Sequence, residues 1–270
     1  MFRRQAVSVA VCVVVCLVVM MLFPGRLMAA CLGAVAELAP RVMPAALRLA
    51  AIPENSARIT FIDHATFMIE SPQGVIAATD YNDYIQPPVR PDIVTMNHAH
   101  STHFSYAPDP AILHVLRGWP HDGKPARHNV QLKDMRVRNV PTNIRGYGET
   151  TEYDGNSIFI FDVAGLCIAH LGHLHHKLTP GHLADLGKID VLFVPVDGGF
   201  TLNIVEMREV VDQVKAPLVI PMHYFSEATL ERFLARLDGH EIKLNDSATT
   251  LVSRASLPRK PTVLVLPGPH

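Results

Sequence analysis

The chain has 270 residues, a formal net charge of −1 and 18% charged residues. This length suits one large domain or two small ones. A net charge so close to zero shows no excess of basic residues for binding nucleic acid, so we expect a small-molecule substrate. Histidine is the unusual residue, with 15 copies against a single Trp, a composition compatible with metal binding.

Residues 1–36 have the pattern of an export signal or a membrane anchor. Two arginines in MFRR precede an uncharged apolar run from Ala6 to Phe23. This is the order found in signal peptides, and the run is also close to the roughly 17–25 residues that span a bilayer. A cleaved signal, a retained anchor and a lipoprotein modified at Cys31 stay open. Each of the three predicts that the folded domain is periplasmic or otherwise extracytoplasmic. A reporter that is active only in the cytoplasm should therefore show no activity when it is fused after Leu266.

Residues 37–56 are rich in Ala and Pro and are expected to form a linker, with the folded domain over 57–270. Short runs rich in Ile, Val, Thr and Phe, separated by turn residues, then predict a series of strands. They cover residues 58–62, 66–71, 74–80, 92–96, 111–116, 130–141, 157–163 and 165–172.

The second half of the chain alternates helices and strands. The segment 179–187, TPGHLADLG, has a Thr cap, Pro at the first helical position and Gly at the end, which predicts a short helix. Residues 202–215 and 226–237 have the apolar spacing of amphipathic helices. Continuous apolar runs predict buried strands at residues 190–196, 217–224 and 261–267. Together these elements predict one α/β domain with two packed sheets and helices outside.

Three groups of histidines each follow an apolar strand. MNHAHSTH contains His98, His100 and His103, HLGH contains His173, and PMHY contains His223. Strand ends in α/β folds converge on one edge, where loops build sites. Neutral imidazole is the commonest metal ligand, and zinc binds it readily. The pattern therefore predicts one metal site at this edge, with His98, His100 and His103 as ligands.

These segments resemble the metallo-β-lactamase superfamily. HAHSTH is similar to its HxHxDH motif, HATFMIE followed by Asp80 to its opening strands, and PLVIPMHY to the strand that carries its last His ligand. The segment that begins HLGH resembles the HLGD-type segment of the branch that includes ascorbate-6-phosphate lactonase. The resemblance covers most of the chain after Arg58. It implies a four-layer αββα sandwich with the metals at one edge, between the sheets.

Both Asp ligands of the family pattern are altered here. Thr102 stands where the first motif has Asp, and His173 stands where the bridging Asp would be. A further family His would fall near Asn143. The metal ligands that the resemblance implies are therefore His98, His100, His103, His173 and His223. Five neutral ligands around two dications would leave a large uncompensated buried charge. Either the site holds one metal, or another carboxylate joins it, with Asp197 in VPVDGGF as the first candidate.

The resemblance implies a hydrolase that uses a metal-bound water on an ester, lactone or phosphoester, and the N-terminal pattern predicts that it is exported. Its cofactor would be one or two zinc ions, although imidazole also suits other transition metals. Asp197 and His176 are the predicted catalytic residues, since His176 lies beside the predicted site and can carry a proton. A non-catalytic metal-binding protein and a mononuclear-iron oxidoreductase on the same scaffold stay open. The substrate, the metal and the oligomeric state are not fixed by the sequence.

Overall fold

The structure is a computed structural model that describes residues 51–146, 148 and 150–268. The predicted export segment 1–36 and residues 37–50 of the predicted linker lie outside the described residues, so both stay predictions. Within the described part of the chain, no helix is long and apolar enough to cross a membrane.

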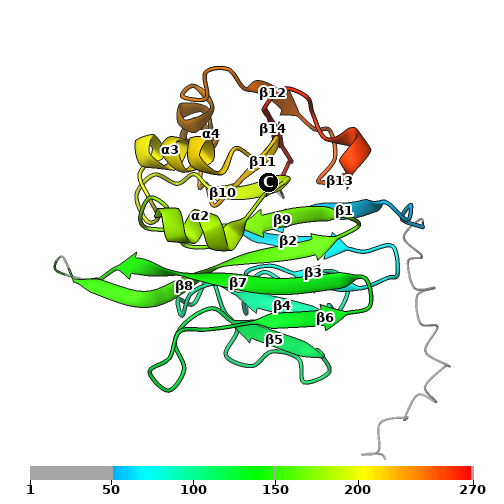
Figure 1. Cartoon of the computed structure of the whole chain (residues 1–270), viewed down its shortest axis with the longest axis vertical. Coiled ribbons are helices and arrows are strands. Elements are labelled where there is room, and N and C mark those ends of the chain that lie inside the picture. Colours follow the sequence, from blue (N-terminus) through cyan, green and yellow to red (C-terminus); the bar gives the residue numbers. More distant parts are fainter. Residues whose placement is uncertain (1–50, 147, 149, 269–270) are drawn as a thin grey trace, which may run out of the picture. The chain divides into compact units, whose positions relative to one another are not determined.

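The described residues form two sheets (Figure 1). The six-stranded sheet has the order β13 (Thr249–Ser253), β1 (Ser56–Asp63), β2 (Thr66–Glu70), β3 (Ile76–Ala78), β4 (Ile93–Met96) and β5 (His114–Arg117). The eight-stranded sheet has the order β12 (Glu241–Leu244), β14 (Thr262–Val265), β11 (Leu218–Met222), β10 (Val191–Pro195), β9 (Leu166–His170), β8 (Thr151–Val163), β7 (Met135–Arg145) and β6 (Asn129–Leu132).

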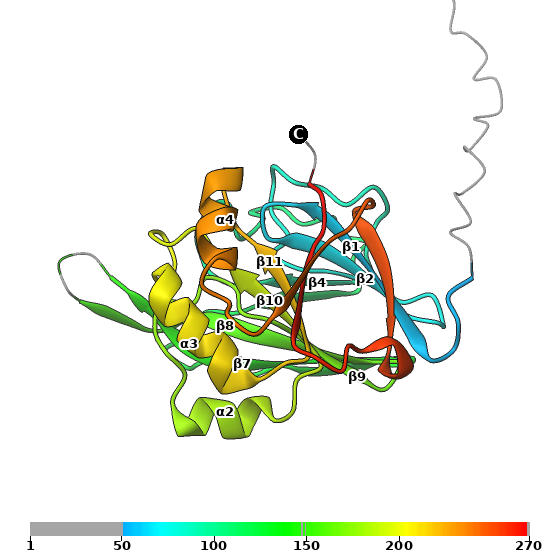
Figure 2. The ribbon, with the colours of Figure 1, turned by 90° about the horizontal axis from the view of Figure 1, so that it is seen from above.

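The three predicted helices are confirmed as α2 (Pro180–Leu186), α3 (Ile204–Val214) and α4 (Glu227–Leu234). Each begins after a polar cap, Thr179, Asn203 or Ser226, whose side chain accepts hydrogen bonds from the first turn. Their apolar faces pack together on the outer face of the eight-stranded sheet, and Figure 2 shows α3 between α4 and α2.

The main core lies between the two sheets. Alternate residues of both sheets point into it, and Phe67 of β2 stacks on Phe193 of β10 with ring centroids 4.1 Å apart. The intervening residues of the same central strands, such as Leu192 and Val194, face the helices. Burial on both faces explains why these strands are continuous apolar runs. The predicted two-sheet sandwich is confirmed, with the described helices over the eight-stranded sheet.

The strand directions bring several loops to one edge. β1, β3 and β4 run the same way in one sheet, and β9, β10 and β11 run parallel in the other. The loops that follow these strands carry the polar residues of the chain's candidate site, because strand ends at one edge place their loops together. Sequence patterns missed β12 and β13, whose side chains are mostly exposed and lack an apolar run.

Candidate metal centre

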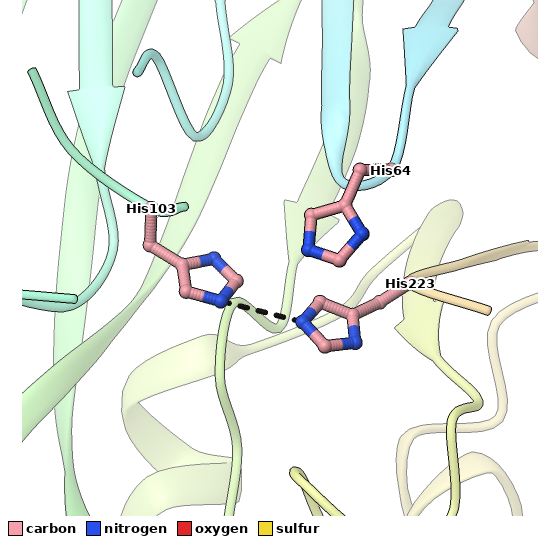
Figure 3. Close-up of side chains that lie close together, drawn as sticks. All are labelled: His64, His103 and His223. Atoms are coloured by element: carbon pink, nitrogen blue, oxygen red, sulfur yellow. Dashed lines mark hydrogen bonds between the residues drawn. The ribbon is translucent and has the colours of Figure 1, made fainter. Parts of the chain in front are cut away.

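His64, His103 and His223 form the tightest group of histidines in the described residues (Figure 3). Their ligand-competent atoms all lie within 4.8 Å of one another. The Nε2 atoms of His103 and His223 face each other 3.3 Å apart. Both of these side chains are buried, at 1% and 2% exposure.

Two carboxylates decide which nitrogen of each facing imidazole carries the proton. Asp80 Oδ2 contacts Nδ1 of His103, and Asp197 Oδ2 lies 3.0 Å from Nδ1 of His223. A carboxylate can only accept, so in each neutral ring the proton is on Nδ1 and Nε2 carries a lone pair. The two Nε2 atoms lie 3.3 Å apart, and a cation placed against both would accept a lone pair from each ring. Carboxylate–histidine pairs of this kind are typical of metal sites, so the donor set fits a metal.

His64 supplies the third nitrogen of this group. Its Nε2 is buried and has no hydrogen-bond partner among the described residues. Its backbone carbonyl accepts a 2.7 Å hydrogen bond from the N–H of His223, which ties the β1–β2 turn to the end of β11. The sequence analysis did not predict His64 as a ligand. The available clue was its place in HATFMIE, in a turn at the edge where the other histidines were expected.

The other predicted ligands lie next to this group. The ring centroid of His173 lies 4.6 Å from that of His103, 5.5 Å from that of His98 and 6.2 Å from that of His100. Nδ1 of His98 lies 2.7 Å from the carbonyl of Gly155, so its proton is there and its Nε2 is free. The structure thus gathers all five predicted histidines, while their role as ligands stays a prediction.

A chain of hydrogen bonds determines which ring nitrogen of a neutral His173 carries the proton. The backbone N–H of Arg145 donates to Nδ1 of His175 over 2.9 Å, so the proton of a neutral His175 is on Nε2. That Nε2 lies 2.8 Å from Nδ1 of His173, which must therefore accept. The proton of a neutral His173 is then on its Nε2. Unlike His103 and His223, His173 offers an N–H rather than a lone pair at this atom.

Gly172 allows His173 to take this position. Gly172 has φ +62°, and a Cβ there would lie 2.4 Å from Nδ2 of Asn97 and 2.5 Å from Oδ1 of Asn156. The same Asn156 oxygen accepts the backbone N–H of His173 over 2.8 Å. Only glycine combines the left-handed backbone with this close approach.

The two predicted catalytic residues are both hydrogen-bonded in the structure, and their catalytic roles stay predictions. Oδ1 of Asp197 accepts the N–H groups of Gly199 and Thr201, and Oδ2 faces His223. Both oxygens of Asp197 are therefore engaged, and one of them faces a histidine. His176 accepts the N–H of Asn143 at Nε2 and contacts the carbonyl of Lys177 at Nδ1. These backbone bonds fasten His176 to β7 and leave neither ring nitrogen free.

Burial and crowding keep four imidazoles of the site neutral, namely His64, His103, His173 and His175. Burial, followed by the neighbouring imidazoles, lowers the pKa of His64 to about 3 and holds those of His103 and His173 well below the ordinary value. Burial and then Arg145 lower the pKa of His175 to about 4. Neutral rings keep their lone pairs, which is the form that binds metals.

The two carboxylates behave differently from each other. Burial raises the pKa of Asp80 to about 6, which still leaves it ionised at neutral pH. Burial would also raise the pKa of Asp197, but hydrogen bonds from His223, Thr201 and the following backbone bring it below its ordinary value. The site therefore carries two negative charges, each behind one of the facing histidines.

His170 makes folding sensitive to acid. It is fully buried, accepts the N–H of Gly172 at Nδ1 and lies 2.8 Å from the carbonyl of Ala65 at Nε2. Burial lowers its pKa to about 4. Because the folded pKa lies below the unfolded value of about 6.5, its contribution is present above pH 6.5 and is lost as the pH falls toward 4.

We expect this histidine alone to lower the free energy of unfolding by roughly 3 kcal/mol between pH 7 and pH 4. Urea unfolding of metal-free protein at a series of pH values measures the change. His170→Gln should show a shallower loss of stability with acid than the parent. An equally steep acid limb in the variant would contradict the assignment.

A family model for the beta-lactamase superfamily domain matches residues 58–223, more than half of the chain. The chain belongs to the metallo-β-lactamase superfamily. The predicted αββα family fold is thereby confirmed. A crystal structure of a candidate Zn-dependent hydrolase of this superfamily from Thermotoga maritima is 29% identical to it, with a TM-score of 0.58, and the match covers 79% of this chain and 100% of that one.

Two curated members of the superfamily show similar coverage. A UPF0173 metal-dependent hydrolase from Carboxydothermus hydrogenoformans is 27% identical over 195 residues, which are 62% of this chain and 84% of the relative. A UPF0173 protein from Pyrococcus furiosus is 25% identical over 205 residues, which are 68% of this chain and 92% of the relative.

Proposed function

We propose that this chain is a metal-dependent hydrolase that uses zinc to cleave a small-molecule ester, lactone or phosphoester. The observation that carries the proposal is the approach of the Nε2 atoms of His103 and His223 to 3.3 Å, with a carboxylate at Nδ1 of each ring. Relatives named metal-dependent hydrolases support the reaction type. The resemblance of the HLGH segment to the lactonase-like branch supports an ester or lactone within this class.

His103, His223 and His64 are the proposed principal ligands, with His98 and His100 extending the donor set. The charges favour one tightly bound ion. One dication is balanced by the two carboxylates of Asp80 and Asp197, each of which contacts a facing histidine. A second dication would leave two uncompensated positive charges in a buried site, which is costly.

A dication at this position supplies Lewis acidity toward water and toward the carbonyl or phosphoryl oxygen of a substrate. The protein's own contribution is orientation. Asp80 and Asp197 fix the tautomers of His103 and His223. His173, predicted from the sequence as a ligand, is proposed instead to donate its Nε2–H to an oxygen on which negative charge develops, held in that tautomer by His175.

The test is hydrolysis by untagged protein of known metal content. A panel of esters, lactones and phosphoesters should include a substrate whose hydrolysis is lost on chelation and restored by zinc. Retention of metal without hydrolysis of any member of the panel would favour a non-catalytic metal-binding protein. Oxygen consumption by the iron-loaded, reduced protein would favour the oxidoreductase alternative.

A further inference from the structure

A cavity of about 230 Å³ opens beside the metal centre. His64 lines it, and the same side chain belongs to the tight group with His103 and His223. A group bound in this cavity would therefore be adjacent to the proposed reaction centre. Cavities next to convergent polar groups are where substrates bind.

The walls of the cavity are aromatic. Phe61, Tyr224 and Phe225 line it, and the ring centroid of Phe225 lies 5.5 Å from those of both His64 and His223. Phe225 is 63% exposed and meets Phe200, which is 67% exposed, with centroids 5.6 Å apart. Exposed aromatic rings that gather at one place are typical of binding sites.

The charged groups of the cavity are acidic. Asp63 and Glu227 line it, and no Lys or Arg is among the described lining residues. Asp63 also accepts the backbone N–H of His64 over 2.7 Å, which places its charge at the metal side of the cavity.

We propose that this cavity binds the part of the substrate beyond the cleaved bond and selects an apolar group that carries a cationic amine. The inference rests on the proposed function and narrows it to amine-bearing carboxylic esters or lactones. A cation is attracted both by the two carboxylates and by the faces of aromatic rings. A phosphoester, with its own negative charge, would be repelled by Asp63 and Glu227. Hydrolysis adds one water across the acyl C–O bond and gives a carboxylate, an alcohol and a proton.

The experiment compares two esters of matched shape, 2-(trimethylammonio)ethyl acetate and its uncharged isostere 3,3-dimethylbutyl acetate. A quaternary ammonium group cannot coordinate a metal, so the pair tests the cavity alone. Binding of the corresponding alcohols is measured by calorimetry, and hydrolysis of the esters by acid release. We expect the charged alcohol to bind at least about tenfold more tightly than the neutral one.

Variants locate the effect. Asp63→Asn combined with Glu227→Gln should reduce the preference to about twofold or less, whereas Glu231→Gln, on the same helix but outside the cavity lining, should leave it unchanged. The inference is overturned if the two alcohols bind equally tightly or if neither of them binds, even if both esters are hydrolysed. A clear preference for the charged alcohol without hydrolysis of any ester would support the cavity's selectivity and contradict the proposed function.

Discussion

Replacing His103 or His223 by alanine is expected to remove the tightly bound metal and to lower the stability of the metal-loaded protein by about 3 kcal/mol. That loss corresponds to a fall in metal affinity of roughly a hundredfold. The reason is linkage, because metal that binds only the folded state adds its binding free energy to folding. Elemental analysis after dialysis and thermal unfolding measure the two effects.

The chelated protein separates the loss of a ligand from damage to the fold. In the presence of chelator, the stability gap between parent and variant should shrink, because no metal contributes to either. Asp197→Asn, which keeps the shape but removes the charge facing His223, should weaken binding about 10–100-fold.

The matched control for these ligand variants is His121→Ala. His121 is 93% exposed beside Asp122, and its loss should stay within about 0.5 kcal/mol. It is a cleaner control than His182, whose side chain closes the capping box of α2. Full metal retention in both His103→Ala and His223→Ala would refute the centre.

The second large effect is expected from His173→Asp, which should raise the metal content from about one ion per chain toward two. The resemblance of HLGH to an HLGD-type segment predicts a bridging Asp at this position, and a third carboxylate would offset part of the charge of a second dication. His173→Asn has the same size without the charge, so it should stay near one ion. Two tightly held ions in the parent protein would show that the charge argument is wrong.

His173→Ala distinguishes a donor from a ligand. If His173 donates from Nε2, the variant should keep its metal and lose turnover by about 10²–10³-fold, as for removal of a donor to a developing charge. If His173 is a ligand, as the sequence predicts, the variant should lose metal. Long-range ¹H–¹⁵N correlation spectra of the parent report the tautomer directly, and a proton on Nδ1 of His173 would contradict the donor role.

Local pattern was sufficient for most of the fold. The capping signals of TPGHLADLG predicted α2, and the structure bears out its Thr179 cap, its Pro180 start and its Gly187 end. The continuous apolar run of β10 predicted a strand buried on both faces, and it lies between the main core and the helices. These features are set by near neighbours in the chain, where propensity and periodicity act.

Local sequence pattern predicted only part of the candidate site. Strand-end placement predicted that His98, His100, His103, His173 and His223 would come together, and they do. His64 was not predicted, because nothing in its local sequence indicates that the β1–β2 turn lies against the end of β11. That contact depends on how the two sheets pack, and it is seen in the hydrogen bond from His223 N–H to the carbonyl of His64.

The sequence by itself determined which elements form, that they make a two-sheet α/β domain, and which edge gathers the histidines, because these follow from period, caps and strand ends. Only the tertiary structure decided what each polar group does there. Asp197 has the same local sequence whether it binds a metal or holds His223, and the choice depends on a contact 26 positions away along the chain. The position of the proton on His173 likewise depends on Arg145, which ends β7, whereas His173 lies in the loop after β9. A tautomer is fixed by the partners that surround a ring in space, and those partners are set by packing between distant segments.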